Sequence, residues 1–288
     1  MNVAEKTEEY RLYTENALKA CLKDGIPPVL EEAMRYSLLA PGKRLRAVMC
    51  LACCEAAGGK REDALPFAVA IEMIHAYSLI HDDLPAMDND TLRRGLPTNH
   101  VVYGEAMAIL AGDSLLNEAF TVMAESPSQN ALRALQYVSL KSGARGMAGG
   151  QALDISLEGT APDRENVKKL HLGKTAALFE AACVSGMMLA GADGEEILAA
   201  ERFARELGLA FQIEDDLLDL YGDEKLLGKH TGKDADENKL TWVRCVGEEQ
   251  ARADVYGHTE QAVRALDRFG NKAEFLQSLA IWMRDRVK

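Results

Sequence analysis

The sequence of 288 residues has few of the patterns that mark β-structure, membrane spans or nucleic-acid binding. Runs of β-branched residues and Asn-Gly turns are missing, which argues against a fold built on β-sheets. No uninterrupted apolar run approaches the roughly 20 residues of a membrane-spanning helix, so we predict no stable membrane insertion. Lys and Arg number 33 against 45 Asp and Glu, and the resulting net charge of −12 argues against nonspecific binding to nucleic acid.

The cysteines and the N-terminal segment give no sign of export or of a structural zinc. Residues 1–13 are charged and lack the apolar core of a signal peptide, so we expect a cytoplasmic protein. Cys50 and Cys53 have the spacing of a zinc knuckle, but the sequence has no second cysteine pair to complete a zinc site. Both cysteines also lie in an apolar helical pattern. We therefore predict buried thiols in a reducing compartment. The six cysteines are Cys21, Cys50, Cys53, Cys54, Cys183 and Cys245.

What the chain does contain is helical periodicity over nearly its whole length, with abundant Ala, Leu, Glu and Met. Residues 68–81 and 203–218 are apolar nearly all round, which indicates helices in the centre of a large bundle. Because no linker, low-complexity tract or fixed-period repeat interrupts the pattern, we predict one all-α domain over residues 1–288. The predicted helices are about 2–23, 28–39, 43–57, 62–84, 104–125, 128–157, 164–190, 194–221, 235–268 and 272–287.

The segment LIHDDLPAMDNDTLRRG, residues 79–95, concentrates charge at the end of a predicted apolar helix. Asp82 and Asp83 lie at its C-terminal end, where the helix dipole disfavours anions, so two carboxylates there call for a compensating cation. Pro85 ends regular helix geometry, and a bend at this point would bring Asp88 back beside Asp82. A solvated acidic loop is the alternative to a metal site.

A second acidic cluster reads FQIEDDLLDLYGD, residues 211–223. Asp215 and Asp219 are four residues apart and share one face of an otherwise apolar helix, with Asp216 beside them. Oxygen ligands without His or Cys favour Mg²⁺ over zinc. Either cluster alone is explained by a solvated face, but two clusters on separate apolar helices favour a metal site.

Basic residues accompany both acidic clusters, as two polyphosphate ligands require. Arg93 and Arg94 follow the first cluster directly. The Gly-Lys-Thr at residues 173–175 is not a P-loop, because position 168 is Lys168 where that motif needs glycine. The remaining basic candidates are Lys43, Arg44 and Arg46 after Pro41-Gly42, and Lys229, Lys233 and Lys239 after the second cluster.

From about residue 36 to 242 the sequence resembles the trans-isoprenyl diphosphate synthases, and most closely the bacterial-type farnesyl and geranylgeranyl diphosphate synthases. The matching segments follow in the family's order: GKRLR at 42–46, IEMIHAYSLIHDDLPAMDNDTLRRGLPTNH at 71–100, GEAMAILAGDSLL at 104–116, GMAGGQALDI at 146–155, GKT at 173–175 and FQIEDDLLD at 211–219. The resemblance implies an isoprenoid synthase-like helical bundle around a central apolar substrate cavity, and a homodimer.

The same resemblance implies a Mg²⁺-dependent, head-to-tail condensation of isopentenyl diphosphate with dimethylallyl or geranyl diphosphate. The implied metal ligands are Asp82, Asp83, Asp88, Asp215, Asp216 and Asp219. The implied contacts to the allylic diphosphate are Arg93, Lys174, Thr175, Gln212, Lys229 and Lys239, and those to isopentenyl diphosphate are Lys43, Arg46, His75 and Arg94. The implied catalytic residues are Asp82, Asp83, Asp88, Arg93, Lys174, Asp215 and Lys229. Asp90 matches no family role and is expected in a solvated turn.

Two of these assignments fall on residue types that ordinarily have a plain structural role. A lone histidine on an apolar helix is usually a satisfied core residue, but His75 lies two turns, about 10 Å, before Asp82 on the same face. A helical glutamine is usually solvated, but Gln212 has apolar neighbours and precedes Asp215 by three positions. Both spacings suit a site beside the metals.

The length of the product depends on residues one turn before the first aspartate. In the family, a bulky aromatic residue five positions before that aspartate closes the pocket at a C15 product, and a small residue admits C20. Tyr77 occupies this position, with Ser78 beside it, so we predict (2E,6E)-farnesyl diphosphate as the product. The alternatives are a plain core role for Tyr77 and geranylgeranyl diphosphate as the product.

A terpene cyclase and a non-catalytic subunit of a heteromeric synthase are disfavoured, because both acidic clusters and the paired basic residues are present.

The sequence departs from the family pattern at two places. Ala47 stands where the first basic motif usually has proline, which is merely convenient early in a helix. After the second acidic cluster, NKLTWVRC at residues 238–245 replaces the bacterial Lys-x-Thr-Tyr-Pro. The second departure leaves the local geometry around Lys239 open.

Overall fold

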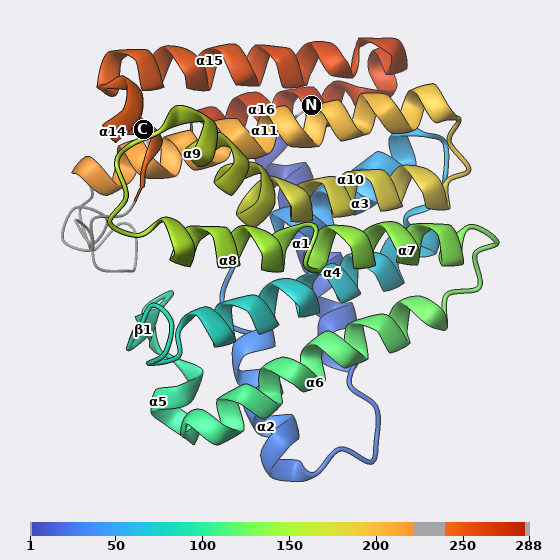
Figure 1. The fold of residues 1–288 in the computed structure, drawn as a ribbon. Helices are drawn as coiled ribbons and strands as arrows, with labels where there is room; N and C mark the ends of the chain where they lie inside the picture. Colours follow the sequence, from blue (N-terminus) through green and yellow to red (C-terminus); the bar gives the residue numbers. More distant parts are fainter. Residues whose placement is uncertain (1, 222–239, 286–288) are drawn as a thin grey trace.

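The computed structural model describes residues 2–221 and 240–285, which form a bundle of helices (Figure 1). The helices are α1 (Val3–Ala20), α2 (Pro28–Leu38), α3 (Leu45–Ala56), α4 (Arg61–Asp82), α5 (Asn99–Tyr103), α6 (Glu105–Ala124), α7 (Ala131–Ser142), α8 (Met147–Leu157), α9 (Arg164–His171), α10 (Ala177–Leu189), α11 (Gly194–Tyr221), α14 (Trp242–Val246), α15 (Glu248–Ala265) and α16 (Glu274–Arg284). A π-helical turn covers Leu172–Ala176, and a 3₁₀ segment covers Asp267–Ala273. The predicted all-α class is confirmed.

Helix α10 is the centre of the core, because every one of its 13 residues is buried. It packs against α3, α4, α7 and α11. The approach to α3 is so close that a Cβ on Gly186 would lie 2.2 Å from the Cys50 carbonyl oxygen. The predicted buried thiols are confirmed for Cys50, Cys53, Cys54 and Cys183, whereas Cys21 and Cys245 are half-buried.

Three predicted helices, 128–157, 164–190 and 235–268, are divided in the structure. The chain turns between α7 and α8 at Gly146, where a Cβ would lie 1.9 Å from the Lys141 carbonyl oxygen. Gly247, with a φ of 81°, separates α14 from α15. The predicted helix over 164–190 contains the π-helical turn. In such a turn, the wider hydrogen-bond ring adds a residue and changes which side chains share a face.

A two-stranded hairpin, β1 (Leu92–Arg93) and β2 (Leu96–Pro97), interrupts the helical pattern after α4. Arg94 and Gly95 form its turn with φ values of 54° and 76°. Two consecutive positive φ values are typical of the tight turns that suit hairpins, although a non-glycine residue seldom adopts this conformation. The hairpin and the C-terminal ends of α4 and α11 gather at one end of the bundle, on the left in Figure 1.

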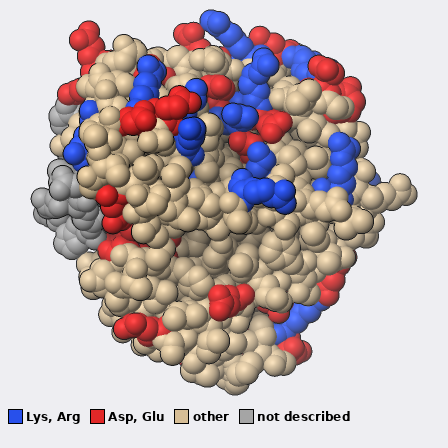
Figure 2. Space-filling view, in the orientation of Figure 1, with Lys and Arg blue, Asp and Glu red and all other residues tan. Residues whose placement is uncertain are grey.

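One face of the molecule has a broad area with few charged side chains, over the middle and lower part in Figure 2. Large apolar side chains are exposed on the helices of this region, with Leu110 at 52% and Leu132 at 68% exposure. The others are Val101, Val102, Ile109 and Leu140, so that α5, α6 and α7 each contribute two. We call these six residues the apolar face.

Two helical stretches, residues 61–82 and 164–189, are long and apolar enough to cross a membrane by length and composition alone. In the fold, 67% and 83% of their most apolar windows are buried inside the protein. Burial by the other helices accounts for their apolar character, so we treat both as core helices.

Two glycine substitutions test the packing of the core, and we expect them to change stability in opposite directions. Gly186→Ala places a methyl group against the α3 backbone, so it should lower the free energy of unfolding by about 1–3 kcal/mol. Gly257→Ala is the control, because no atom lies within 4 Å of the added Cβ in α15. This change should raise the free energy of unfolding by about 0.5–1 kcal/mol, because alanine favours helix. Urea unfolding measures both, and equal effects would contradict the proposed packing.

Candidate active site

A cavity of about 400 Å³ lies at the end of the bundle, between α4 and α11. Carboxylates line it from α4, the loop after α4, α8 and α11, and basic groups lie among them. The acidic residues are Asp82, Asp88, Asp90, Asp154, Asp215, Asp216 and Asp219. The basic residues are Arg46, Arg93, Arg94 and Lys174, accompanied by His75 and His171. The predicted residues Thr175 and Gln212 also line this cavity.

The bend predicted after α4 is present and brings Asp88 back to Asp82. The backbone N–H of Asp88 donates a hydrogen bond to the Asp82 carbonyl at 2.9 Å. Leu84 accepts backbone hydrogen bonds from Met87 and from Asn89, whose φ is 49°. Burial raises the pKa of Asp82 to about 6; the Lys174 ammonium opposes this rise and the Asp88 carboxylate adds to it. The two carboxylates therefore repel one another in a poorly solvated place.

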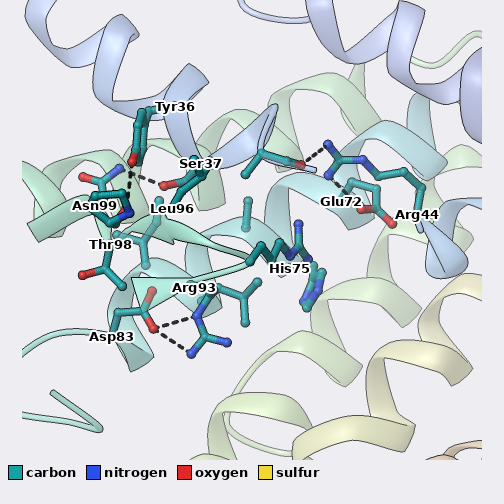
Figure 3. A pocket seen from close by; sticks show the side chains of 16 residues that line it. Tyr36, Ser37, Arg44, Glu72, His75, Asp83, Arg93, Leu96, Thr98 and Asn99 are labelled. Carbon is teal, nitrogen blue, oxygen red and sulfur yellow. Dashed lines mark hydrogen bonds and ion pairs between the residues drawn. The ribbon is translucent and has the colours of Figure 1, made fainter. Parts of the chain in front are cut away.

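Asp83 points away from the large cavity, although it was predicted as a metal ligand. Arg93 Nε and Nη2 both lie 2.6 Å from Asp83 Oδ1, so this bridge fixes the hairpin to the end of α4. The pair borders a separate pocket of about 40 Å³ behind the hairpin, which Figure 3 shows together with Glu72 and Arg44. The direction follows from helix geometry, because adjacent residues point about 100° apart.

The prediction that Asp90 lies in a solvated turn is wrong. Its side chain is 20% exposed, and Oδ2 lies 3.5 Å from Arg93 Nη2. Asp90 also lines the large cavity. Arg93 therefore lies between two carboxylates, Asp83 and Asp90, and reaches the cavity from the hairpin.

On the opposite side, α11 presents Asp215 and Asp219 to the cavity, as their spacing predicts. Asp216 differs from them, because its Oδ2 accepts the backbone N–H of Trp242 at 2.6 Å. Within residues 2–221 and 240–285, no three His, Cys, Asp or Glu side chains converge closely enough to hold a metal ion by themselves. The two acidic sets therefore face one another across the cavity.

Lys174 enters the cavity from the π-helical turn, supported by α8. A Cβ on Gly150 of α8 would lie 2.1 Å from the Lys174 backbone nitrogen, so only glycine permits this approach. Lys174 Nζ donates a hydrogen bond to Asp154 Oδ2 at 2.6 Å. Burial alone would lower the pKa of Lys174, but the carboxylates of Asp154 and Asp82 raise it above its ordinary value. Lys174 is therefore a fixed cation between two acidic groups.

Asp154 is a cavity residue for which the sequence pattern predicted no role. The signal was present in GMAGGQALDI, where Gln151 and Asp154 are three residues apart on one face of a helix. Thr175 and Gln212 also interact directly, because the threonine hydroxyl donates a hydrogen bond to Gln212 Oε1. These contacts connect α8, the π-helical turn and α11 around one side of the cavity.

A basic group lies on the α3 side of the cavity. Arg46 Nη1 lies 3.2 Å from His75 Nε2, and its guanidinium is 5.0 Å from the centroid of the Phe179 ring. Burial lowers the pKa of Arg46 to about 10, so it stays charged at neutral pH. Burial and the nearby arginines lower the pKa of His75, which favours a neutral ring that accepts a hydrogen bond from Arg46. Arg94 packs against Gly42, where a Cβ would lie 2.8 Å from Arg94 Nη1.

One predicted basic residue in the described part of the chain, Lys43, is not among the residues that line this cavity. Lys43 extends towards α16, with Nζ 5.4 Å from the centroid of the Trp282 ring. Lys229 and Lys239, like Lys233, lie outside the described residues, so their roles stay predictions.

A second cavity of about 330 Å³ adjoins the first and shares Asp82, Lys174 and Thr175 with it. Tyr77 and Ser78 line it, together with Met87, Met147 and the ring of His81. Tyr77 packs edge-on against His81 with ring centroids 5.7 Å apart. The region beyond the carboxylates is therefore walled largely by apolar and aromatic groups.

The match to a family decides what kind of protein carries this site. A family model described as polyprenyl synthetase matches residues 27–277. The chain belongs to the polyprenyl synthetase family. A polyprenyl synthetase of this kind is a trans-prenyltransferase of isoprenoid biosynthesis, as the resemblance in the acidic and basic motifs predicts.

Individual relatives of this polyprenyl synthetase cover nearly its whole length. A geranylgeranyl diphosphate synthase of Cyanophora paradoxa is 44% identical over 283 residues, which are 96% of this chain and 94% of that protein. The crystal structure of an FPP/GFPP synthase from Zymomonas mobilis matches with a TM-score of 0.86 and 36% identity, over 98% of each chain. A Helicobacter pylori geranyltransferase complexed with magnesium and isoprenyl diphosphate matches with a TM-score of 0.85 and 30% identity, over 100% of this chain and 98% of that one.

Proposed function

We propose that this polyprenyl synthetase condenses isopentenyl diphosphate head-to-tail with dimethylallyl or geranyl diphosphate in a Mg²⁺-dependent reaction. The observation that carries the proposal is the large cavity, where two sets of carboxylates face one another with arginine and lysine groups between them. Two substrates that each carry a diphosphate need separate cationic groups, and the arginine and lysine side chains among the carboxylates provide them. The adjoining cavity provides a largely apolar place for a prenyl chain.

The residues present fit magnesium. The facing donors are carboxylates, which hard divalent cations prefer, and the raised pKa of Asp82 reflects burial that a bound cation would compensate. Asp82 and Asp88 would hold it from one side, and Asp215 and Asp219 from the other. Because the two sets do not converge by themselves, a diphosphate between them would supply the remaining oxygen ligands. When bound, magnesium would neutralise the charge that develops on the leaving diphosphate.

Lys174, Thr175 and Gln212 are proposed to hold the allylic diphosphate. Lys174 already lies between Asp154 and Asp82, so its position is fixed before a ligand arrives. A preorganised cation stabilises the charge on the departing oxygen without a rearrangement during the reaction. Arg93 reaches the same cavity from the hairpin, with its direction fixed by Asp83. Lys229 and Lys239 are proposed as further contacts on the basis of the resemblance alone.

Arg46, His75 and Arg94 are proposed to hold isopentenyl diphosphate. They line the side of the cavity next to α3, and Arg46 and His75 are in hydrogen-bond contact. Lys43, three residues before Arg46, is proposed as a further contact on the basis of the resemblance alone. Because two arginines and a neutral histidine concentrate donors in a partly buried place, a diphosphate would bind there more strongly than at a solvated surface.

The reaction follows from these positions. The C–O bond of the allylic diphosphate breaks, its electron pair leaves with the diphosphate, and an allylic cation remains. The double bond of isopentenyl diphosphate supplies the electrons of the new C–C bond, and a proton leaves the adjacent carbon. The released diphosphate is the proposed proton acceptor. The apolar walls keep water from the cation.

Farnesyl diphosphate is our proposed product, and geranylgeranyl diphosphate is the second candidate. Tyr77 in the wall of the adjoining cavity supports the shorter product, because its ring occupies space that a longer chain would need. The names of relatives support the longer product, since one 44% identical protein is a geranylgeranyl diphosphate synthase. Sizing the products formed from labelled isopentenyl diphosphate and geranyl diphosphate distinguishes the two.

We also propose that a second copy of this chain covers the apolar face. Helices α5, α6 and α7 each place two large apolar side chains on the surface, and Figure 2 shows few charges there. Such a surface is typical of an interface between subunits. Helix α6, which contributes Ile109 and Leu110 to the apolar face, packs directly on α4. A dimer would therefore support the helix that carries Asp82.

Removal of one carboxylate tests the proposed reaction. Asp82→Asn keeps the shape of the side chain but loses its charge, so turnover should fall by about 10²–10³-fold. The measurement is the Mg²⁺-dependent incorporation of labelled isopentenyl diphosphate into a longer prenyl diphosphate. Asp24→Asn, in an exposed loop, is the matched control and should keep the wild-type rate. A wild-type protein without condensation activity would refute the function, and a fully active Asp82→Asn would refute the assignment of Asp82.

Enlargement of the second cavity tests the proposed product. Tyr77→Ala removes the aromatic ring from the cavity wall, so the main product should shift from C15 to C20 or longer. Chromatography of the dephosphorylated products measures the shift. Tyr256→Ala, at an exposed tyrosine of α15, controls for the loss of a ring elsewhere and should not change product length. An unchanged profile in Tyr77→Ala would mean that Tyr77 does not limit the chain.

Disruption of the apolar face tests the dimer. Wild-type protein should sediment with about twice the 31.5 kDa mass of one chain. Leu110→Glu places a charge on the apolar face and should shift the species towards one chain. Leu198→Glu changes an exposed leucine of α11 outside the apolar face and should leave the mass unchanged. Wild-type protein that sediments as a single chain at every concentration would contradict the proposal.

A further inference from the structure

Trp242 is the first residue of α14 and is buried by side chains of other helices. It belongs to residues 238–245, where the sequence departs from the family pattern. Its side chain is 1% exposed. The indole N–H donates a hydrogen bond to Asp254 Oδ2 of α15 at 2.8 Å. The His171 ring of α9 stacks on the indole with centroids 6.1 Å apart, and the His258 ring meets it edge-on at 6.3 Å. The Arg164 guanidinium lies 5.0 Å from the ring centroid.

The backbone of Trp242 is attached to the acidic helix α11. Its N–H donates a hydrogen bond to Asp216 Oδ2 at 2.6 Å, and His171 Nε2 lies 3.6 Å from the same oxygen. Asp216 thus binds the start of α14, whereas Asp215 and Asp219, on either side of it in sequence, face the cavity. The two residues before Trp242, Leu240 and Thr241, line the large cavity.

These contacts give the segment a defined place. Helices α9 and α15 hold the indole, and α11 holds the backbone N–H of the same residue through Asp216. Rotation or withdrawal of the indole would break its contacts with α9 and α15. Because Leu240 and Thr241 directly precede Trp242 in the chain, their position on the cavity wall depends on this attachment. A wall beside the reacting centre matters most when an intermediate reacts readily with water.

We propose that Trp242 is a positioning residue that fixes Leu240 and Thr241 as a wall excluding water from the allylic cation. Two fates compete once the C–O bond of the allylic diphosphate has broken. Attack by isopentenyl diphosphate forms a C–C bond with loss of one proton, and gives the longer prenyl diphosphate. Attack by water forms a C–O bond with loss of one proton, and gives the allylic alcohol. The position of Trp242 affects the ratio of these products more than the rate of ionisation.

The inference rests on the proposed condensation, and its test separates the two claims. Wild-type protein, Trp242→Phe and Trp242→Leu are each incubated with Mg²⁺, labelled geranyl diphosphate and isopentenyl diphosphate. Free geraniol and the longer prenyl diphosphate are quantified without phosphatase treatment. Tyr256→Leu is the control, because Tyr256 is an exposed aromatic residue on α15, the helix that carries Asp254. Thermal unfolding verifies that each variant is folded.

We expect the ratio of alcohol to condensation product to rise about tenfold in Trp242→Leu, which corresponds to about 1.4 kcal/mol of partitioning free energy. Trp242→Phe keeps an aromatic ring but loses the N–H donor, so its ratio should rise by a smaller factor. Total ionisation, the sum of both products, should stay within about threefold of wild type, because the residues proposed to stabilise the leaving diphosphate are unchanged. Tyr256→Leu should show the wild-type ratio.

Other outcomes overturn the inference. An unchanged ratio in a folded Trp242→Leu contradicts it, including the case where both products decrease together. If Trp242→Leu does not fold, Trp242→Phe decides, and an unchanged ratio there contradicts the inference. A wild-type protein that forms no longer prenyl diphosphate instead contradicts the proposed condensation itself.

Discussion

The repulsion among carboxylates at the end of α4 and the facing side of α11 is the constraint on which the rest of this structure depends. Asp82 and Asp88 are brought together by a backbone hydrogen bond, and burial raises the pKa of Asp82. Such an arrangement is unfavourable unless cations compensate it. Lys174 and Arg93 supply part of that compensation in the protein itself, and the proposed metal would add to it.

The apolar core holds these charges in place. Helix α10 is buried along its whole length and follows directly from the π-helical turn that carries Lys174. The backbone of α8 approaches the turn at Gly150 so closely that the position of Lys174 is fixed by main-chain contact. A rigid backbone at this point lets a flexible lysine act as a preorganised cation.

The sequence was sufficient to predict the helical class, the bend after α4 and the pairing of Asp82 with Asp88, because each follows from local pattern or from proline chemistry. It was not sufficient to predict in which direction each of two adjacent aspartate side chains points. Asp83 and Asp216 each adjoin a cavity aspartate, yet one binds Arg93 and the other binds the Trp242 backbone. Those partners come from other elements, the hairpin and α14, and not from the helix that carries each aspartate. Local periodicity carries no information about such contacts.

The two facing acidic sets are proposed to bind magnesium together with a diphosphate, because their described side chains do not converge closely enough to hold it alone. The direct measurement is calorimetric titration of Mg²⁺ into the wild-type protein, with and without inorganic diphosphate. We expect weak binding of Mg²⁺ alone and an affinity at least about tenfold higher with diphosphate present. Equal affinities in the two titrations would contradict it.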